Sequence, residues 1–306
     1  MKDAVLAEVI RSGVVESQHR GFLIALNADG SVNLELGDSS HLIFPRSTVK
    51  SFQAAAMVRS GLELEPRLLA LGASSHSGSP EHIAAVREIL AIAGLDDSAL
   101  QCMLDRPLGE AERRAYGDQP ATRIAMNCSG KHAAMLLTCV KNGWSIDNYL
   151  EADHPLQVAC REELENLSGE KITLTSTDGC GAPLFLISVA GLARAIRAIT
   201  ISEEPAHRLV IEASRAFPEM VAGDGRLTTE MIREVPGLYM KDGVEAVEVA
   251  SMPDGRTLVF KVSDGSLRPF RALVHAGLKR LGVESKYEIE PVLGGGKVIG
   301  EVRATF

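Results

Sequence analysis

The chain has 306 residues, of which 45% are apolar, which is enough for one large domain or two smaller ones with a sizeable core. Its 40 acidic and 32 basic residues give a formal net charge of −8, and no strongly basic segment stands out. Together with an aromatic content of only 4%, this balance argues against nucleic acid as a partner.

The sequence also argues against a membrane or secreted protein. No stretch approaches the ~20 uncharged apolar residues that span a bilayer, and acidic residues interrupt the first apolar segment, unlike a signal peptide. The five cysteines are an odd number, which indicates thiols rather than a disulfide framework. We therefore expect a cytoplasmic protein without a membrane partner.

The N-terminal part of the chain has strand patterns. Residues 4–11 and 21–27 read as strands, and the Asp29-Gly30 turn leads into an alternating return strand at 31–36. The segment 16–21 between the first two strands is polar, and we predict a solvated loop there.

A short stretch at Pro45 connects a strand to a helix. Pro45 ends the apolar segment 42–44, and Ser47 is a natural N-cap for a helix that runs to about Gly61. Lys50 then lies one turn after Ser47 on the same helix face. A serine and a lysine at this spacing can form a nucleophile and its base, although the S-x-x-K pattern alone is common by chance.

The middle of the chain is mainly helical, because apolar residues recur there at helical spacing. Pro80 suits the first turn of one of these helices. The predicted helices cover residues 65–73, 80–94, 133–140, 155–167, 184–196, 203–217 and 229–234, with a strand at 172–175 and an irregular excursion at 104–122.

Strands return at the end of the chain, and we predict them at residues 244–251, 256–262 and 298–305, with a helix at 267–281. Strands segregated at both chain ends predict an α+β fold, with an antiparallel sheet built from N- and C-terminal strands and flanking helices. The sheet subregion would comprise residues 1–50 and 240–306, and the helical subregion residues 51–239. The cleft between them would be the default binding site.

Several short motifs follow one another along nearly the whole chain. They are Glu16-Ser17-Gln18-His19-Arg20-Gly21, Pro45-Arg46-Ser47 with Lys50, Ser75-His76-Ser77-Gly78, Asn127-Cys128-Ser129-Gly130-Lys131-His132, His154-Pro155-Leu156-Gln157, Asp178-Gly179-Cys180-Gly181-Ala182-Pro183, and Lys261 with Asp264-Gly265. Each is modest evidence alone, but chance would have to supply all of them in order. Together they resemble the rhizobial-type L-asparaginase family, often called asparaginase II.

The resemblance implies a fold similar to serine β-lactamases and glutaminases, with a single asparaginase domain over residues 1–306. In such folds the serine of the S-x-x-K motif begins a helix, and a second lysine lies on a late edge strand. Lys261, at the end of the predicted strand 256–262, matches that second lysine.

The implied reaction is hydrolysis of the side-chain amide of L-asparagine to L-aspartate and ammonia through an acyl-enzyme. Ser47 would be the nucleophile and Lys50 would take its proton, with the Ser47 amide in the oxyanion hole. Ser75 would relay protons with the support of Lys261. The same comparison places five further residues around the substrate, namely Arg46, His76, Glu16, Asn127 and Gly181.

The resemblance also implies zinc. Cys128, Lys131 and Cys180 would hold the ion, and Asp178 would contact a metal-bound water. Such a site has one exchangeable position, and it would assist substrate binding rather than supply the nucleophile. From spacing alone, Cys128 and Cys180 are ordinary buried thiols.

Three positions depart from the family pattern as we describe it, namely Ser79, Asp224 and Thr228, and they bear on fine specificity and turnover. Two alternatives to an asparaginase stay open: a glutaminase or other small-amide or ester hydrolase of the same fold, and a catalytically impaired relative that binds a metal or ligand. The expected partner is a small-molecule substrate, and the family resemblance implies a homodimer.

Overall fold

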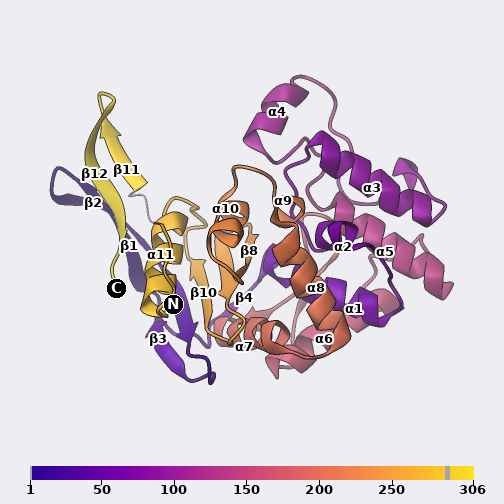
Figure 1. The fold of residues 1–306 in the computed structure, drawn as a ribbon, viewed down its shortest axis with the longest axis horizontal. Helices are drawn as coiled ribbons and strands as arrows, with labels where there is room; N and C mark the ends of the chain where they lie inside the picture. Colours follow the sequence, from indigo (N-terminus) through magenta and orange to yellow (C-terminus); the bar gives the residue numbers. More distant parts are fainter. Residues whose placement is uncertain (1, 287–289) are drawn as a thin grey trace. The chain divides into compact units, whose positions relative to one another are not determined.

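The computed structural model describes residues 2–286 and 290–306, and its largest element is a curled antiparallel sheet (Figure 1). The strand order is β11-β12-β1-β2-β10-β9-β8, and β3 pairs with β2 beside this path. The strands are β1 (Ala4–Arg11), β2 (Val14–Leu26), β3 (Val32–Leu36), β8 (Tyr239–Gly243), β9 (Val247–Ser251), β10 (Thr257–Val262), β11 (Glu290–Gly294) and β12 (Lys297–Ala304).

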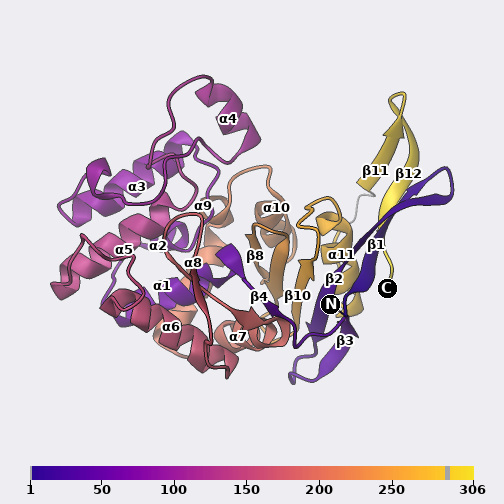
Figure 2. The ribbon, with the colours of Figure 1, turned by 180° about the vertical axis from the view of Figure 1, so that it is seen from behind.

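The two ends of the chain meet in this sheet, which confirms the predicted α+β fold. Indigo β1 lies beside yellow β12 in both views (Figures 1 and 2), and Ala7 pairs with Ala304 across the two strands. Two helices, α7 (Val189–Ile201) and α11 (Phe270–Arg280), pack on the sheet. Phe270 of α11 meets Phe260 of β10 edge to face, with ring centroids 5.1 Å apart.

The polar segment 16–21 is a strand, so the predicted loop is wrong. It belongs to β2, which pairs with β1 from Val14 onwards. Polar cross-strand contacts hold it there, including an Arg11 to Glu16 ion pair of 2.7 Å. Pairing with β1 therefore decides the conformation of a segment whose composition indicates a turn.

Strand β8 was missed by the sequence analysis, which began the hairpin at residue 244. The strand pairs with β9 through a tight turn in which Glu245 and Ala246 have φ angles of 62° and 58°. Turns of this kind favour Gly or Asn, so neither residue signals the turn in the sequence.

The chain divides into two compact units. The first contains the chain up to Thr48, Ile187–Ile201 and the chain from Glu234 onwards, and the second contains Val49–Leu186 and Ser202–Arg233. Helix α7 therefore belongs with the sheet, whereas we placed it in the mainly helical subregion 51–239. The single asparaginase domain over 1–306 stays a prediction.

The second unit is mainly helical. Proline occupies the first turn of several of its helices, where the missing N–H costs no hydrogen bond. The helices are α1 (Lys50–Arg59), α2 (Pro66–Gly72), α3 (Pro80–Ile92), α4 (Glu110–Tyr116), α5 (Ser129–Asn142), α6 (Pro155–Ser168), α8 (Pro205–Ala216), α9 (Pro218–Val221) and α10 (Leu227–Glu234). Short strands β5 (Thr175–Thr177) and β6 (Pro183–Phe185) pair in this unit, and β4 (Leu42–Ile43) pairs with β7 (Ile187–Ser188) in the other.

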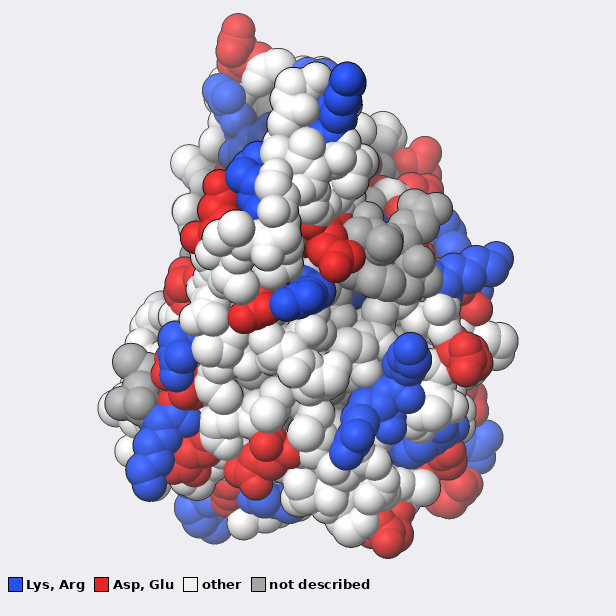
Figure 3. All heavy atoms as spheres, turned by 90° about the vertical axis from the view of Figure 1, so that its left-hand side faces the viewer, with Lys and Arg blue, Asp and Glu red and all other residues white. Residues whose placement is uncertain are grey.

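Two segments differ from their predicted form. Helix α4 lies inside the segment 104–122, which we predicted to be irregular, and the predicted helix 184–196 begins as β6 and β7 before α7. No helix in the described part of the chain is long and apolar enough to cross a membrane. Acidic and basic side chains are interspersed on the face drawn in Figure 3.

Candidate active site

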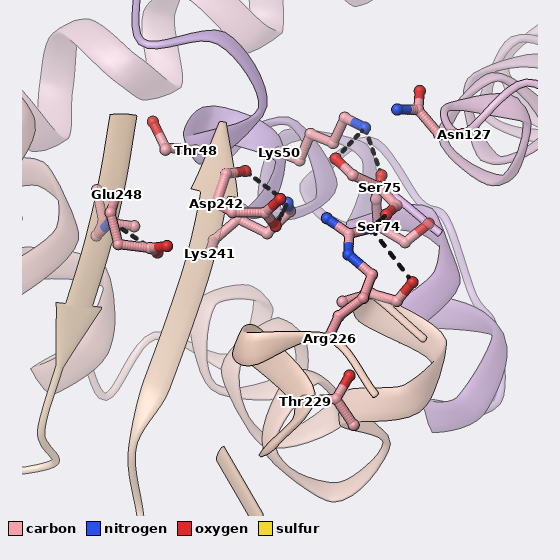
Figure 4. A network of polar contacts seen from close by, with 12 residues as sticks. Thr48, Lys50, Ser74, Ser75, Asn127, Arg226, Thr229, Lys241, Asp242 and Glu248 are labelled. Carbon is pink, nitrogen blue, oxygen red and sulfur yellow. Dashed lines mark hydrogen bonds and ion pairs between the residues drawn. The ribbon is translucent and has the colours of Figure 1, made fainter. Parts of the chain in front are cut away.

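Lys50 is a candidate catalytic residue with three hydrogen-bond partners for its side chain. It begins α1, and only 1% of the residue is exposed. Its Nζ donates to Ser75 Oγ at 2.9 Å and to the carbonyl of Ser74 (Figure 4). It also donates to Cys128 Sγ at 3.0 Å. A buried amino group is costly without hydrogen-bond partners, so these three contacts hold Lys50 in one position.

The segment that carries Ser75 is extended and runs between α2 and α3. Its backbone is held by long-range hydrogen bonds, because Ser75 N donates to Val221 O and His76 N donates to Asn127 O. Ser75 is itself buried, with 3% of its surface exposed. The structure therefore brings Lys50 and Ser75, two of the predicted catalytic residues, into direct contact.

The predicted metal ligands also lie together. Cys128 stands directly before α5, Lys131 lies in its first turn, and Cys180 lies in the loop between β5 and β6. Lys131 Nζ is 3.2 Å from Cys180 Sγ, and the Cys128 and Cys180 thiols are hydrogen-bonded. Because Cys128 also contacts Lys50, the metal candidates and the catalytic candidates form one continuous cluster.

Attraction between opposite charges stabilises this cluster. The hydrogen bond from Cys128 and the positive charge of Lys131 hold the pKa of Cys180 well below its usual value, although burial opposes them. Burial acts to lower the pKa of Lys131, but the neighbouring Cys180 and Cys128 outweigh it and raise that pKa. The cluster thus pairs a thiolate with an ammonium group inside the protein.

The donor chemistry of the cluster fits zinc. Two sulfurs and one amine converge from α5 and the β5–β6 loop, and such a set leaves a fourth position open for exchange. No group of three or more His, Cys, Asp and Glu side chains suited to a metal occurs among the described residues, so the fit depends on Lys131. Lys131 would have to lose its proton to bind the ion.

Ser47 lies in the first unit, at the start of the helical stretch. It occupies a 3-10 turn, η1 (Arg46–Val49), and Val49 rather than Ser47 is the residue before α1. The predicted N-cap role is therefore wrong, because the 3-10 turn shifts the start of the α-helix by two residues. Arg46, directly before Ser47, has a φ of 53°, a conformation that costs about 1 kcal/mol or more for a residue with a side chain.

Strand β8 ends against the backbone of Ser47. A Cβ atom at Gly243 would lie 3.3 Å from Ser47 N and 3.0 Å from Pro45 O, so a side chain there would fit only if this backbone moved slightly. Lys241 precedes Gly243 by two residues on this strand, and only 1% of it is exposed. Its Nζ donates to Asp242 Oδ1 at 2.8 Å (Figure 4).

Lys241 is a candidate residue that the sequence analysis missed. We had matched the second lysine to Lys261 on the premise that it ends an edge strand, but β10 lies between β2 and β9 and is interior. The edge strand of this end of the sheet is β8, which carries Lys241. The signal available in the sequence was a lysine immediately before an Asp-Gly pair, directly ahead of the predicted strand 244–251.

Lys261 remains half-buried near Arg46. Its Nζ donates to Val262 O at 2.9 Å and to the carbonyl of Glu245. Burial lowers the pKa of Lys261, and Arg46 acts in the same direction, while Glu245 and Asp264 oppose them.

The model of the family described as L-asparaginase II matches residues 7–304 of this chain. The chain belongs to the L-asparaginase II family. The predicted resemblance is thereby confirmed, and it makes the protein a hydrolase in the general sense. No curated protein matches this asparaginase II chain significantly.

Solved structures resemble this family member only distantly. A beta-lactamase from Mycobacterium bovis has 16% sequence identity and a TM-score of 0.41, over 85% of this chain and 94% of that chain. EstCE1, a hydrolase with promiscuous acyltransferase activity, has 10% identity and a TM-score of 0.40, over 89% of this chain and 92% of that chain.

The predicted substrate-binding residues of this family member occupy different environments. Arg46 precedes Ser47 directly, and Asn127 Oδ1 accepts from Cys128 Sγ at 3.1 Å. Gly181 follows Cys180 in the same loop with a φ of 90°. Their assignment to substrate stays a prediction.

Glu16 and His76 are engaged by other groups. Glu16 is exposed on the β1–β2 hairpin and pairs with Arg11. His76 is fully buried, and its Nε2 lies 2.9 Å from Ser129 Oγ. Asp178 Oδ2 is 3.8 Å from Cys180 Sγ, which places it beside the predicted metal ligands.

The three departures from the family pattern have structural roles here. Ser79 caps α3 by accepting from His82 N, and Asp224 pairs with Arg233 at 2.7 Å. Thr228 is buried in the first turn of α10.

Burial of His76 predicts a pH dependence of stability. Burial and then the nearby charge of His82, Lys50 and Arg226 lower its pKa well below the usual value of 6.5. The unfolded chain therefore binds a proton more readily than the folded protein, so stability is complete above pH 6.5 and falls as the pH drops below it. One such site contributes at most about 1.4 kcal/mol per pH unit. Urea unfolding between pH 8 and pH 5 should show a shallower loss for His76→Gln than for the native protein, and parallel curves would contradict the assignment.

Proposed function

We propose that this protein is an L-asparaginase, which hydrolyses the side-chain amide of L-asparagine to L-aspartate and ammonia through an acyl-enzyme on Ser47. Family membership supports the reaction class. The observation that carries the chemistry is the buried contact of 2.9 Å between Lys50 Nζ and Ser75 Oγ, which supplies a lysine and serine pair for proton transfer.

In the proposed reaction, Ser47 Oγ attacks the amide carbon of the substrate and Lys50, in its neutral form, takes the hydroxyl proton. The carbon–nitrogen bond then breaks, and the proton reaches the leaving nitrogen through Lys50 and Ser75, so that ammonia departs. Water attacks the resulting ester, gives up a proton by the same route, and returns Ser47 to its hydroxyl form as aspartate leaves. The Ser47 amide would stabilise the oxyanion in both steps.

Cys128, Lys131 and Cys180 are the residues that would hold zinc. When bound, the ion would supply a fixed positive charge that attracts a carboxylate or carbonyl oxygen of the substrate. Asp178, beside Cys180, would orient water at the site. The homodimer and the cytoplasmic location stay predictions.

Ammonia release tests the nucleophile. Purified protein should release ammonia from L-asparagine, and Ser47→Ala should lower kcat by at least about 10³-fold, because the acyl-enzyme cannot form. The control is Ser40→Ala, which removes an exposed hydroxyl that bonds only to Asp38 among the described residues and should leave kcat unchanged. Full turnover by Ser47→Ala would refute the assignment, and faster turnover of glutamine than of asparagine would make the enzyme a glutaminase.

The same assay separates the two candidates for the second lysine. Lys261→Met tests the residue matched by sequence, and Lys241→Met tests the buried residue on β8. Replacing the lysine that supports proton transfer should lower kcat by at least about 100-fold. The other variant should keep kcat within a few fold of the native value. Thermal unfolding of both variants shows whether either loss reflects folding, and two unimpaired variants would remove the second lysine from the mechanism.

Zinc content tests the metal site. Elemental analysis should find close to one zinc per chain in protein prepared with zinc, and much less in Cys180→Ser, because that variant lacks one of two sulfur donors. Cys160→Ala is the matched control, since Cys160 is a buried thiol on α6 outside the cluster. Equal zinc in Cys180→Ser and the native protein would exclude Cys180 as a ligand.

A further inference from the structure

The Ser75 segment is held from one side by a loop that no part of the proposed reaction uses. This 221–226 loop connects α9 to α10 and carries Val221, Ala222, Gly223 and Arg226. Ser75 N donates to Val221 O at 2.9 Å, and Ser77 Oγ donates to Ala222 O, also at 2.9 Å. Two residues of the segment are thus tied to successive carbonyls of the loop.

The loop approaches the segment too closely for any side chain at its centre. Gly223 has a φ of 130°, and a Cβ atom built on it would lie 2.1 Å from Ser77 Oγ. Any other residue would therefore push the loop away from Ser77.

Arg226 completes this contact. Its Nη1 donates to the carbonyl oxygen of Ser75 at 2.6 Å, and the side chain is half-buried (Figure 4). On the other side, Lys50 donates to Ser75 Oγ and to the carbonyl of Ser74. Ser75 therefore lies between two side-chain donors: Lys50 contacts its hydroxyl and the preceding carbonyl, and Arg226 contacts its own carbonyl. Hydrogen bonds from a charged donor are stronger than neutral ones, so Arg226 is well suited to fix this peptide group.

We propose that Arg226 is a positioning residue for Ser75, and that it holds the Ser75 hydroxyl within reach of Lys50 during proton transfer. This inference rests on the proposed role of Ser75 as a proton relay. The physical reason is geometric. Without the guanidinium, the Ser75 carbonyl loses its charged donor, which leaves the hydrogen bond from His76 N to Asn127 O to hold that peptide group. The group is then less firmly placed, and a misplacement of about 1 Å in a reacting group can cost about 10²-fold in rate.

A second arginine offers an internal control. Arg233, on α10 itself, pairs with Asp224 of the loop at 2.7 Å and with Glu219 at 3.0 Å. Its side chain is half-exposed, so these ion pairs contribute little to stability, and neither Asp224 nor Glu219 belongs to the Ser75 segment. Arg233 therefore ties the same loop from the solvent side without contacting Ser75.

The test compares Arg226→Met, Arg226→Lys and Arg233→Met with the native protein, measuring kcat, KM and the unfolding temperature. Asparagine and the chromogenic ester p-nitrophenyl acetate are assayed in parallel. We expect Arg226→Met to lose 10- to 100-fold in kcat with KM within threefold, Arg226→Lys to recover at least a third of native kcat, and Arg233→Met to remain native.

The outcomes distinguish the two hypotheses. If the native protein cleaves the ester but not asparagine, the proposed substrate is refuted. The kcat of Arg226→Met on the ester, relative to the native kcat, then still decides the role of Arg226. The positioning role is refuted if Arg226→Met keeps kcat within threefold on a substrate that the native protein cleaves. It is also refuted if Arg233→Met loses as much kcat as Arg226→Met. The same holds if Arg226→Met is unfolded at the assay temperature and Arg226→Lys is folded but recovers no kcat. If the native protein cleaves neither substrate, both hypotheses are refuted.

Discussion

The buried amino group of Lys50 is the constraint on which the helical half of the candidate site depends. An amino group with 1% of the residue exposed needs partners, and it finds them in Ser74, Ser75 and Cys128. Each of these comes from a different stretch of chain than Lys50. The ends of α1, α2 and α5 are therefore held together by one side chain, and removal of that side chain would leave polar groups buried without partners.

The contact between Lys50 and Cys128 joins the candidate catalytic residues to the candidate metal ligands, which lie far apart in the sequence. Cys128 touches Lys50 on one side and Cys180 on the other, and Cys180 is held as a thiolate beside Lys131. Metal binding to the thiol cluster, or its oxidation, would therefore affect Lys50, the proposed base, through its hydrogen bond to Cys128. In such a network the effects of single substitutions are not additive, so variants of Lys50, Cys128 and Cys180 are best compared in pairs.

The loops around Ser75 show how a reactive segment without secondary structure of its own is kept in place. Ser75 has no helix or strand to fix its backbone, since it lies between α2 and α3. Val221, Asn127 and Arg226 supply hydrogen bonds from outside the segment, directly or through the neighbouring residue His76. Rigid scaffolds commonly position functional loops in this way, and the order of the loop then depends on residues far away in the chain.

Local patterns in the sequence determined most of the elements: the strands at both chain ends, the helices that begin with proline, and the spacing of Ser47 and Lys50. They did so because helix periodicity, proline placement and turn residues act within a few positions of one another. Only the tertiary structure decided that residues 16–21 are a strand, that β8 rather than β10 is the edge, and that Cys128 and Cys180 meet. These outcomes depend on partners distant in sequence. Segment 16–21 is a strand because it pairs with β1, and Cys128 meets Cys180 because of where α5 begins. Such contacts produce no hydrophobic periodicity in the local sequence. The choice between Lys241 and Lys261 belongs to the same class, since strand order is a property of the whole sheet.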